Sequence, residues 1–182
     1  MARNTITRSL HDVGLAAWFG GTLANAVALN SAAAQADSPN STGAVANVGW
    51  NRWTPVNAAA IGAHVFGSLG QLGGNAGRLQ MQKGVGSMAL AKTALTAVAL
   101  GATAYSRVLG RRVSEKTDVA AASGTDPAPT TPDDVAAAQR QLAILQWAVP
   151  ALTGALGVVS AFAGEQQRAV EVHKGVIRRL LG

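Results

Sequence analysis

The sequence predicts an all-α fold: a four-helix transmembrane bundle with left-handed packing, followed by a C-terminal amphipathic helix at the membrane surface. Three observations support this prediction. The 182-residue chain is 48% hydrophobic and 13% charged, which is about half the charge of an ordinary soluble domain. It contains four apolar segments separated by polar stretches. At about 1.5 Å per helical residue, each segment is long enough to cross a hydrocarbon core of about 30 Å.

The first apolar segment, residues 13–34, has two interpretations. Basic residues precede it and small residues follow it up to Asp37, which is typical of a secretory signal cleaved after Ala36. The segment has about 22 residues, however, whereas the core of a signal peptide has about 7 to 15. Asp12 directly before the segment also disfavours a signal. We therefore expect a retained first span.

The second apolar segment, residues 53–72, begins at a pair of tryptophans. Trp50 and Trp53 flank an arginine, and an indole ring suits the membrane interface because it joins an apolar body to a hydrogen-bonding edge. At the end of the segment, Gly70 and Gly74 have the four-residue spacing that permits close approach of another helix.

The third segment, residues 85–109, is interrupted early by a single lysine, Lys92. A lysine at the centre of a membrane helix costs about 2.5 to 3.5 kcal/mol on insertion scales. One explanation is that the long side chain reaches back to the interface. The other is an ion pair with Asp12, since four spans place the starts of the first and third spans on the same side. Asp12 and Lys92 are therefore a candidate ion pair.

The rest of the chain predicts a linker, a fourth span and a tail. Residues 113–131 are rich in Ser, Thr, Asp, Pro and Ala and predict a flexible linker. Thr131, Pro132 and the two aspartates after them predict a capped helix start, and the span of that helix covers residues 142–164. Residues 165–181 place apolar side chains on one face and most basic ones off it, which predicts the amphipathic helix.

One uncharged polar residue lies near the middle of each span. The four are expected within about one helical turn of the same depth, as a buried polar layer: Asn25, His64, Thr96 and Thr153. The functional interpretation is a site for a proton, an ion or a quinone headgroup, because polar groups are costly in lipid. The structural interpretation, which we favour, is hydrogen bonding between helices or from threonine to its own backbone.

No group of residues in the sequence is typical of a catalytic site. The chain has no cysteine, its three histidines are dispersed, and it lacks metal-binding, phosphate-binding and nucleophile motifs. The net charge of +6 lies mainly between and beyond the apolar segments, as anionic lipid favours, without the interleaved aromatic residues of a nucleic-acid site. We therefore expect no enzyme, no metal and no nucleic acid, and quinone is the one cofactor that we consider.

Four stretches resemble a family of small, uncharacterised actinobacterial membrane proteins. They are LHDVGLAAWFGG at 10–21, VGWNRWTPV at 48–56, KTALTAVALGATAYSRVLG at 92–110, and residues 139–168, which end in GEQQR. The likeness covers most of the chain. It implies a small membrane protein and no particular activity.

The function predicted from these features is that of a noncatalytic accessory, scaffold or interaction subunit. We expect it to be a multi-pass protein of the bacterial inner membrane with cytoplasmic termini. Its expected partners are the lipid bilayer, a larger membrane or respiratory complex, or further copies of itself. Two alternatives stay open: a small transporter or quinone-linked respiratory subunit that uses the polar layer, and an oligomeric helical scaffold peripheral to the membrane.

Overall fold

The structure, a computed structural model, is an array of four long helices. It describes residues 4–82, 84–116 and 120–165, together with 172 and 177. Its elements are α1 (Thr5–Ala24), the π-helical turn η1 (Asn25–Leu29), α2 (Asn30–Ala33), α3 (Pro39–Gly74), α4 (Ala76–Met81), α5 (Val85–Glu115) and α6 (Asp133–Glu165). The described residues form no strand, so the all-α prediction is confirmed for this part of the chain.

Three helical stretches are long and apolar enough to cross a membrane. They have 29, 31 and 33 residues and cover Thr5–Ala33, Val85–Glu115 and Asp133–Glu165. The predicted second span lies within α3, which does not reach the same hydropathy. That helix carries Asn57, His64 and Gln71 along its length, and these polar residues lower its mean hydropathy. The composition thus indicates a membrane protein with three candidate spans, and crossing by α3 stays a prediction.

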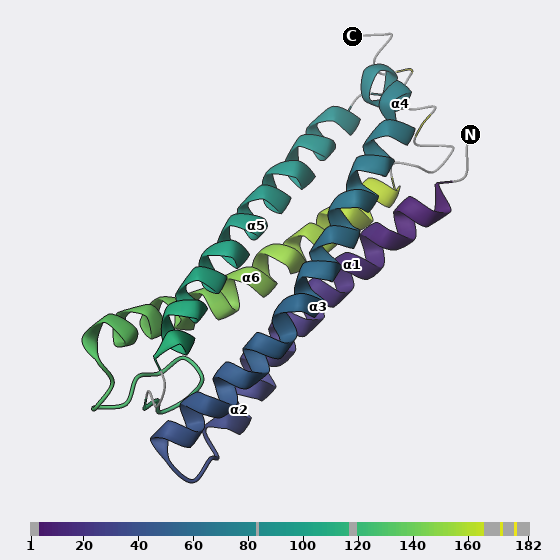
Figure 1. Ribbon diagram of the computed structural model, residues 1–182. Coiled ribbons are helices and arrows are strands. Elements are labelled where there is room, and N and C mark those ends of the chain that lie inside the picture. Colours follow the sequence, from purple (N-terminus) through teal and green to yellow (C-terminus); the bar gives the residue numbers. More distant parts are fainter. Residues whose placement is uncertain (1–3, 83, 117–119, 166–171, 173–176, 178–182) are drawn as a thin grey trace.

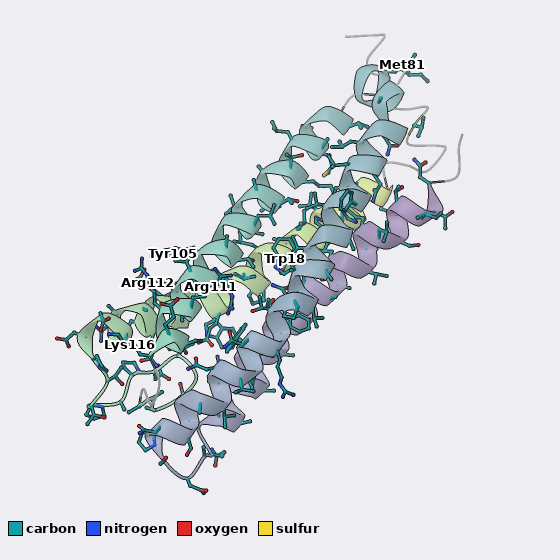
Figure 2. The ribbon with its side chains drawn as sticks, viewed as in Figure 1. Trp18, Met81, Tyr105, Arg111, Arg112 and Lys116 are labelled. Carbon is teal, nitrogen blue, oxygen red and sulfur yellow. The ribbon has the colours of Figure 1, made fainter. Side chains whose placement is uncertain are left out.

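The long helices are arranged as two pairs. α1 packs along α3, and α5 packs along α6 (Figure 1). α1 also contacts α6 and so joins the two pairs. In contrast, α3 and α5 make few contacts with each other. The centre of the array is marked by Trp18, whose side chain is fully buried (Figure 2).

Glycines bring α1 and α3 into backbone contact. A Cβ atom at Gly14 would lie 2.5 Å from the carbonyl oxygen of Ala60, and one at Gly67 would lie 2.3 Å from the backbone nitrogen of His11. No residue with a side chain fits at such distances. Gly70 and Gly74 also face α1, against side chains at its start, so the glycine spacing in the sequence did indicate a helix contact.

The connection between α5 and α6 differs from the flexible linker expected at 113–131. Residues 113–115 belong to α5, and the described part of the connection is a hydrogen-bonded loop. Ala121 donates its backbone N–H to the carbonyl of Pro39 at 3.0 Å, which attaches the loop to the start of α3. Thr131, expected as a helix cap, instead donates its hydroxyl to the carbonyl of Ala120 and accepts from the backbone of Ala128.

The predicted amphipathic helix at 165–181 lies almost wholly outside the described residues. Helix α6 itself begins at Asp133 and runs to Glu165, with both aspartates in its first turn. Acidic side chains there complement the positive end of the helix dipole, which explains why the helix starts at this point.

Candidate functional site: a cleft between α3 and α5

Two cavities lie between α3 and α5, the long helices that scarcely touch. Each has a volume of about 300 Å³. Residues of α1 and α6 contribute to the walls of both cavities, and Leu100 of α5 lines both. The two cavities follow one another along α5 with Leu100 at their boundary, and we refer to the two together as the cleft.

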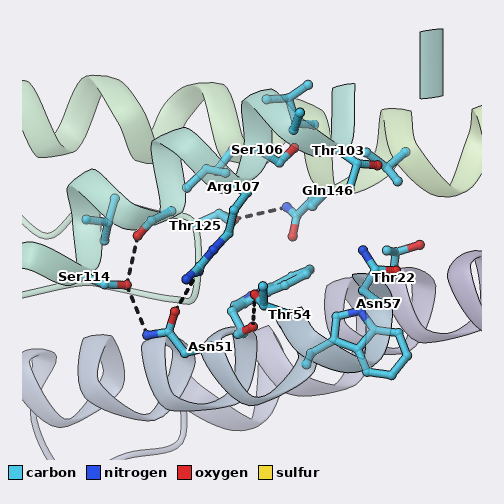
Figure 3. Close-up of a pocket in the computed structure, with 18 of the residues that line it drawn as sticks. Thr22, Asn51, Thr54, Asn57, Thr103, Ser106, Arg107, Ser114, Thr125 and Gln146 are labelled. Carbon is cyan, nitrogen blue, oxygen red and sulfur yellow. Dashed lines mark hydrogen bonds between the residues drawn. The ribbon is translucent and has the colours of Figure 1, made fainter. Parts of the chain in front are cut away.

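The arginine cavity is the half of the cleft near the loop that precedes α6. Its polar walls come from α1, α3, α5, α6 and that loop (Figure 3). Among the polar side chains that line it are Asn51, Trp53, Asn57, Arg107, Ser114 and Gln146. Arg107 donates from Nη1 to Oδ1 of Asn51 at 2.7 Å. The amide of Asn51 in turn donates to the hydroxyl of Ser114 at 3.5 Å. The guanidinium is thus held from the α3 side of the cavity.

A chain of hydrogen bonds crosses the wall of the arginine cavity. Trp50 donates from Nε1 to Oδ1 of Asn30 at 2.9 Å, and Asn30 donates from Nδ2 to Oε1 of Gln146 at 2.6 Å. Gln146 continues the chain with a 3.0 Å bond to the hydroxyl of Thr125. These four side chains link α2, α3, α6 and the loop, so they fix the shape of this end of the cleft.

Several buried polar atoms at the arginine cavity have no hydrogen-bond partner. They are Nε of Arg107, Nε1 of Trp53 and Oδ1 of Asn57. A buried polar group without a partner costs about 1 to 3 kcal/mol, and a charged group more. The cavity walls therefore present two donors and one acceptor that water or a ligand would satisfy.

The histidine cavity is the other half of the cleft, and it includes His11, Asp12 and Lys92. Nδ1 of His11 donates to Oδ1 of Asp12 at 2.7 Å, and Arg8 lies 3.8 Å from the same carboxylate. The ring of His11 lies 4.5 Å, centroid to centroid, from the ring of His64, and both residues are almost fully buried.

The hydrogen bonds define the tautomers of this histidine pair. A carboxylate and a carbonyl are acceptors, so Nδ1 of His11 donates to Asp12, and Nδ1 of His64 donates to the carbonyl of His11 at 3.3 Å. This leaves Nε2 of each neutral ring as an acceptor, and neither Nε2 has a partner. The pair therefore presents two buried acceptor nitrogens on neighbouring helices.

Asp12 and Lys92, the predicted ion pair, lie at the same cavity, but no contact between them is found in the described part of the chain. Among the described residues, the cations found in contact with Asp12 are Arg8 and, when protonated, His11. The Asp12–Lys92 contact therefore stays a prediction.

The predicted polar layer is divided between buried and half-buried positions. His64 and Thr153 are fully buried, whereas Thr96 and Asn25 are half-buried. Thr96 donates to the carbonyl of Lys92 at 2.8 Å and Thr153 to that of Val149 at 2.9 Å, so both threonines bond their own helix. No hydrogen bond joins any two of these four described residues.

Sequence reasoning missed His11 and Arg107 as parts of a site. No site role is predicted for His11 from the sequence, although its place next to Asp12 indicates a partner for its ring. Arg107 lies near the end of an apolar segment, where arginine is common, and nothing in the local pattern indicates that it lines a cavity. Asn30 and Gln146 are far apart in the chain, and only the fold brings them together.

The described residues thus form a helical protein with three helices able to cross a membrane and, in its side, a mostly apolar cleft that carries a few polar side chains. No family model, curated protein or solved structure matches the chain. The resemblance to actinobacterial membrane proteins therefore stays a prediction. In the described part of the chain, no group of three or more His, Cys, Asp or Glu is placed to hold a metal ion.

Proposed function

We propose that the protein is a noncatalytic accessory subunit of the bacterial inner membrane, and that it binds a ligand in the cleft between α3 and α5. The observation that carries this proposal is the set of buried, unpartnered polar atoms around that cleft. Such groups destabilise a protein unless something satisfies them, and they persist where they serve binding.

The size and lining of the cleft agree with a small amphiphile. Ligand sites are mostly apolar concavities of about 300 to 1,000 Å³ with a few placed polar groups. Each half of this cleft has about 300 Å³ and combines aliphatic walls with a few polar side chains. A ligand could place its headgroup in one half of the cleft and extend an alkyl or ring portion past Leu100. Such a ligand would fill both halves.

The test is to fill the cleft and measure what stays bound. Ala104 lines the arginine cavity, whereas Val98 on the same helix is 56% exposed and lines neither cavity. We expect Ala104→Trp to reduce co-purifying small molecules at least tenfold, as read by native mass spectrometry of the detergent-purified chain. Val98→Trp should leave them unchanged.

Two outcomes would contradict the proposal. Equal loads of bound molecules in wild type and Ala104→Trp would show that the cleft is not the site. Release of the chain from membranes by alkaline carbonate would favour the alternative of a peripheral oligomeric scaffold.

The histidine pair favours a second candidate, a small transporter or a quinone-linked respiratory subunit. The two unpartnered Nε2 atoms of His11 and His64 would accept hydrogen bonds from the hydroxyls of a quinol or from a proton-carrying water. Under this candidate, His64→Ala abolishes quinone-linked or transport activity in membranes. Retention of full activity in His64→Ala would leave the histidine pair a structural role.

A further inference from the structure

The formal charge at the arginine cavity is positive. Of the described residues that line it, Arg107 is the only one with a formal charge, and none is Asp or Glu. No ion pair of Arg107 is found in the described part of the chain. Arg107 is half-buried as a residue, and its Nε is a buried atom without a partner, so this part of the guanidinium has lost water without gaining an ion pair.

The guanidinium is positioned to receive an anion. Its Nη1 is bonded to Asn51, which fixes its orientation, while its Nε is buried and has no partner. A guanidinium presents its N–H groups as a planar fork that matches the oxygens of phosphate or carboxylate. One edge of Arg107 is therefore held by the protein, and another is left for a ligand.

Neighbouring groups extend the same site. The indole N–H of Trp53 is a second unpartnered donor that an anionic oxygen would accept from. Asn57 is 8% exposed, and its unpartnered Oδ1 would accept from a hydroxyl. An anionic group that also carries hydroxyls, such as a glycerol phosphate, would satisfy all three.

The remaining wall of the arginine cavity is aliphatic. It includes Ile61, Leu100, Leu142, Leu145 and Val149. This wall would pack against an alkyl chain, with a gain of about 0.8 kcal/mol per buried methylene. A free inorganic anion would leave this part of the cavity unused, so the lining favours an amphiphile.

We propose that the arginine cavity binds the anionic headgroup of a phosphate-bearing lipid, with Arg107 as its counter-ion and the aliphatic wall against its first chain segment. This inference rests on the proposed ligand-binding function of the cleft.

The test measures lipid selectivity in the purified full-length chain. Tryptophan fluorescence or native mass spectrometry would follow titration with phosphatidylglycerol, with zwitterionic phosphatidylcholine and with inorganic phosphate, in neutral detergent. We expect binding of phosphatidylglycerol alone. Loss of one charge-assisted hydrogen-bonded pair should make Arg107→Gln bind about 10- to 100-fold more weakly.

Matched variants separate the site from a general charge effect. Arg111 lies one helical turn further along α5, is exposed and does not line the cavity, so Arg111→Gln should bind phosphatidylglycerol like wild type. Arg107→Lys keeps the charge without the fork and should give an intermediate affinity. It also keeps the test usable if Arg107→Gln does not fold, as judged by helical circular dichroism.

Three outcomes would overturn the inference. Equal binding of both lipids, with Ala104→Trp removing both, would show a cleft without anion selectivity and leave the proposed function standing. Equal affinity for inorganic phosphate and phosphatidylglycerol would make a soluble anion the ligand. Lipid binding that Ala104→Trp and Arg107→Gln leave unchanged would refute this inference and the proposed function together.

Discussion

Hydroxyl side chains inside the helices mostly return their hydrogen bonds to their own backbone. Thr22, Thr96 and Thr153 each donate to a carbonyl four residues earlier. This self-pairing explains why a threonine at the middle of a predicted span is not by itself evidence for a site. Thr103 is different, because it accepts a 3.2 Å hydrogen bond from the indole of Trp18 on α1.

Substitution by valine should lower the free energy of unfolding by different amounts at these two kinds of threonine. Thr153→Val removes only a bond within α6, so we expect a change in the free energy of unfolding below about 1 kcal/mol. Thr103→Val leaves the buried N–H of Trp18 without its acceptor and should cost about 1 to 3 kcal/mol. Reversible unfolding in detergent would measure both. A larger loss for Thr153→Val would point to a partner on another helix.

The contacts of Asp12 with His11 and Lys92 can be tested by double-mutant cycles. Its carboxylate accepts from His11, so Asp12→Ala and His11→Ala should be non-additive by about 0.5 to 3 kcal/mol in a double-mutant cycle. The cycle of Asp12→Ala with Lys92→Ala checks the predicted ion pair, for which we expect the smaller coupling. Strict additivity in the second cycle would rule that pair out.

Glycines on α1 and α3 bring the backbones of these two helices close together. Small residues let helix backbones approach so closely that van der Waals packing stabilises the pair without a hydrophobic driving force. The same approach brings His11 over His64. The geometry of the histidine cavity is therefore a consequence of where the glycines lie.

A valine at the contact should separate the two helices. Gly14→Val would place side-chain atoms into the backbone of α3 and should destabilise the fold by about 1 to 3 kcal/mol or more. Gly20→Val is the matched control, since a Cβ there meets nothing within 4 Å. Thermal unfolding followed by helical circular dichroism would compare them. Equal melting temperatures would contradict the close α1–α3 contact.

Helices were predictable from this sequence, and the cleft was not. A long apolar segment specifies a helix locally, so the segments around Trp18, Lys92 and Thr153 all lie in helices. The cleft depends on which helices fail to touch, and that is a property of the tertiary arrangement. Of the predicted site residues, His64 lies beside the cleft at the histidine pair, while Arg107 was recognisable only once α3 and α5 were placed.

The topology of the molecule in the membrane depends on α3. Because α3 packs along α1, we expect the two helices to cross the membrane together, although the composition of α3 alone does not indicate a span. Asn57 and His64 of α3 are buried within the helix array. The fold thus explains how a helix of lower hydropathy would be accommodated in lipid.

Cysteine labelling would decide the topology, because the chain has no cysteine of its own. The loop before α6 is bonded to the start of α3, so Ser38→Cys and Ser123→Cys should react with a membrane-impermeant maleimide from the same side. Gly77→Cys, beyond the other end of α3, should react only from the opposite side. Labelling of all three from one side would show that α3 does not cross.

The π-helical turn η1 determines which face of the first span points inward at its end. Trp18, Thr22, Ala26 and Asn30 are all buried, and they follow one another at four-residue intervals. In a regular α-helix each such interval drifts by about 40°, or about 120° over the three. The wider turn absorbs most of this rotation, so the face that packs at Trp18 still points inward at Asn30. If these residues formed a regular α-helix of the same length, Asn30 would turn away from Trp50 and Gln146, and the cleft would lose the wall that these three side chains hold together.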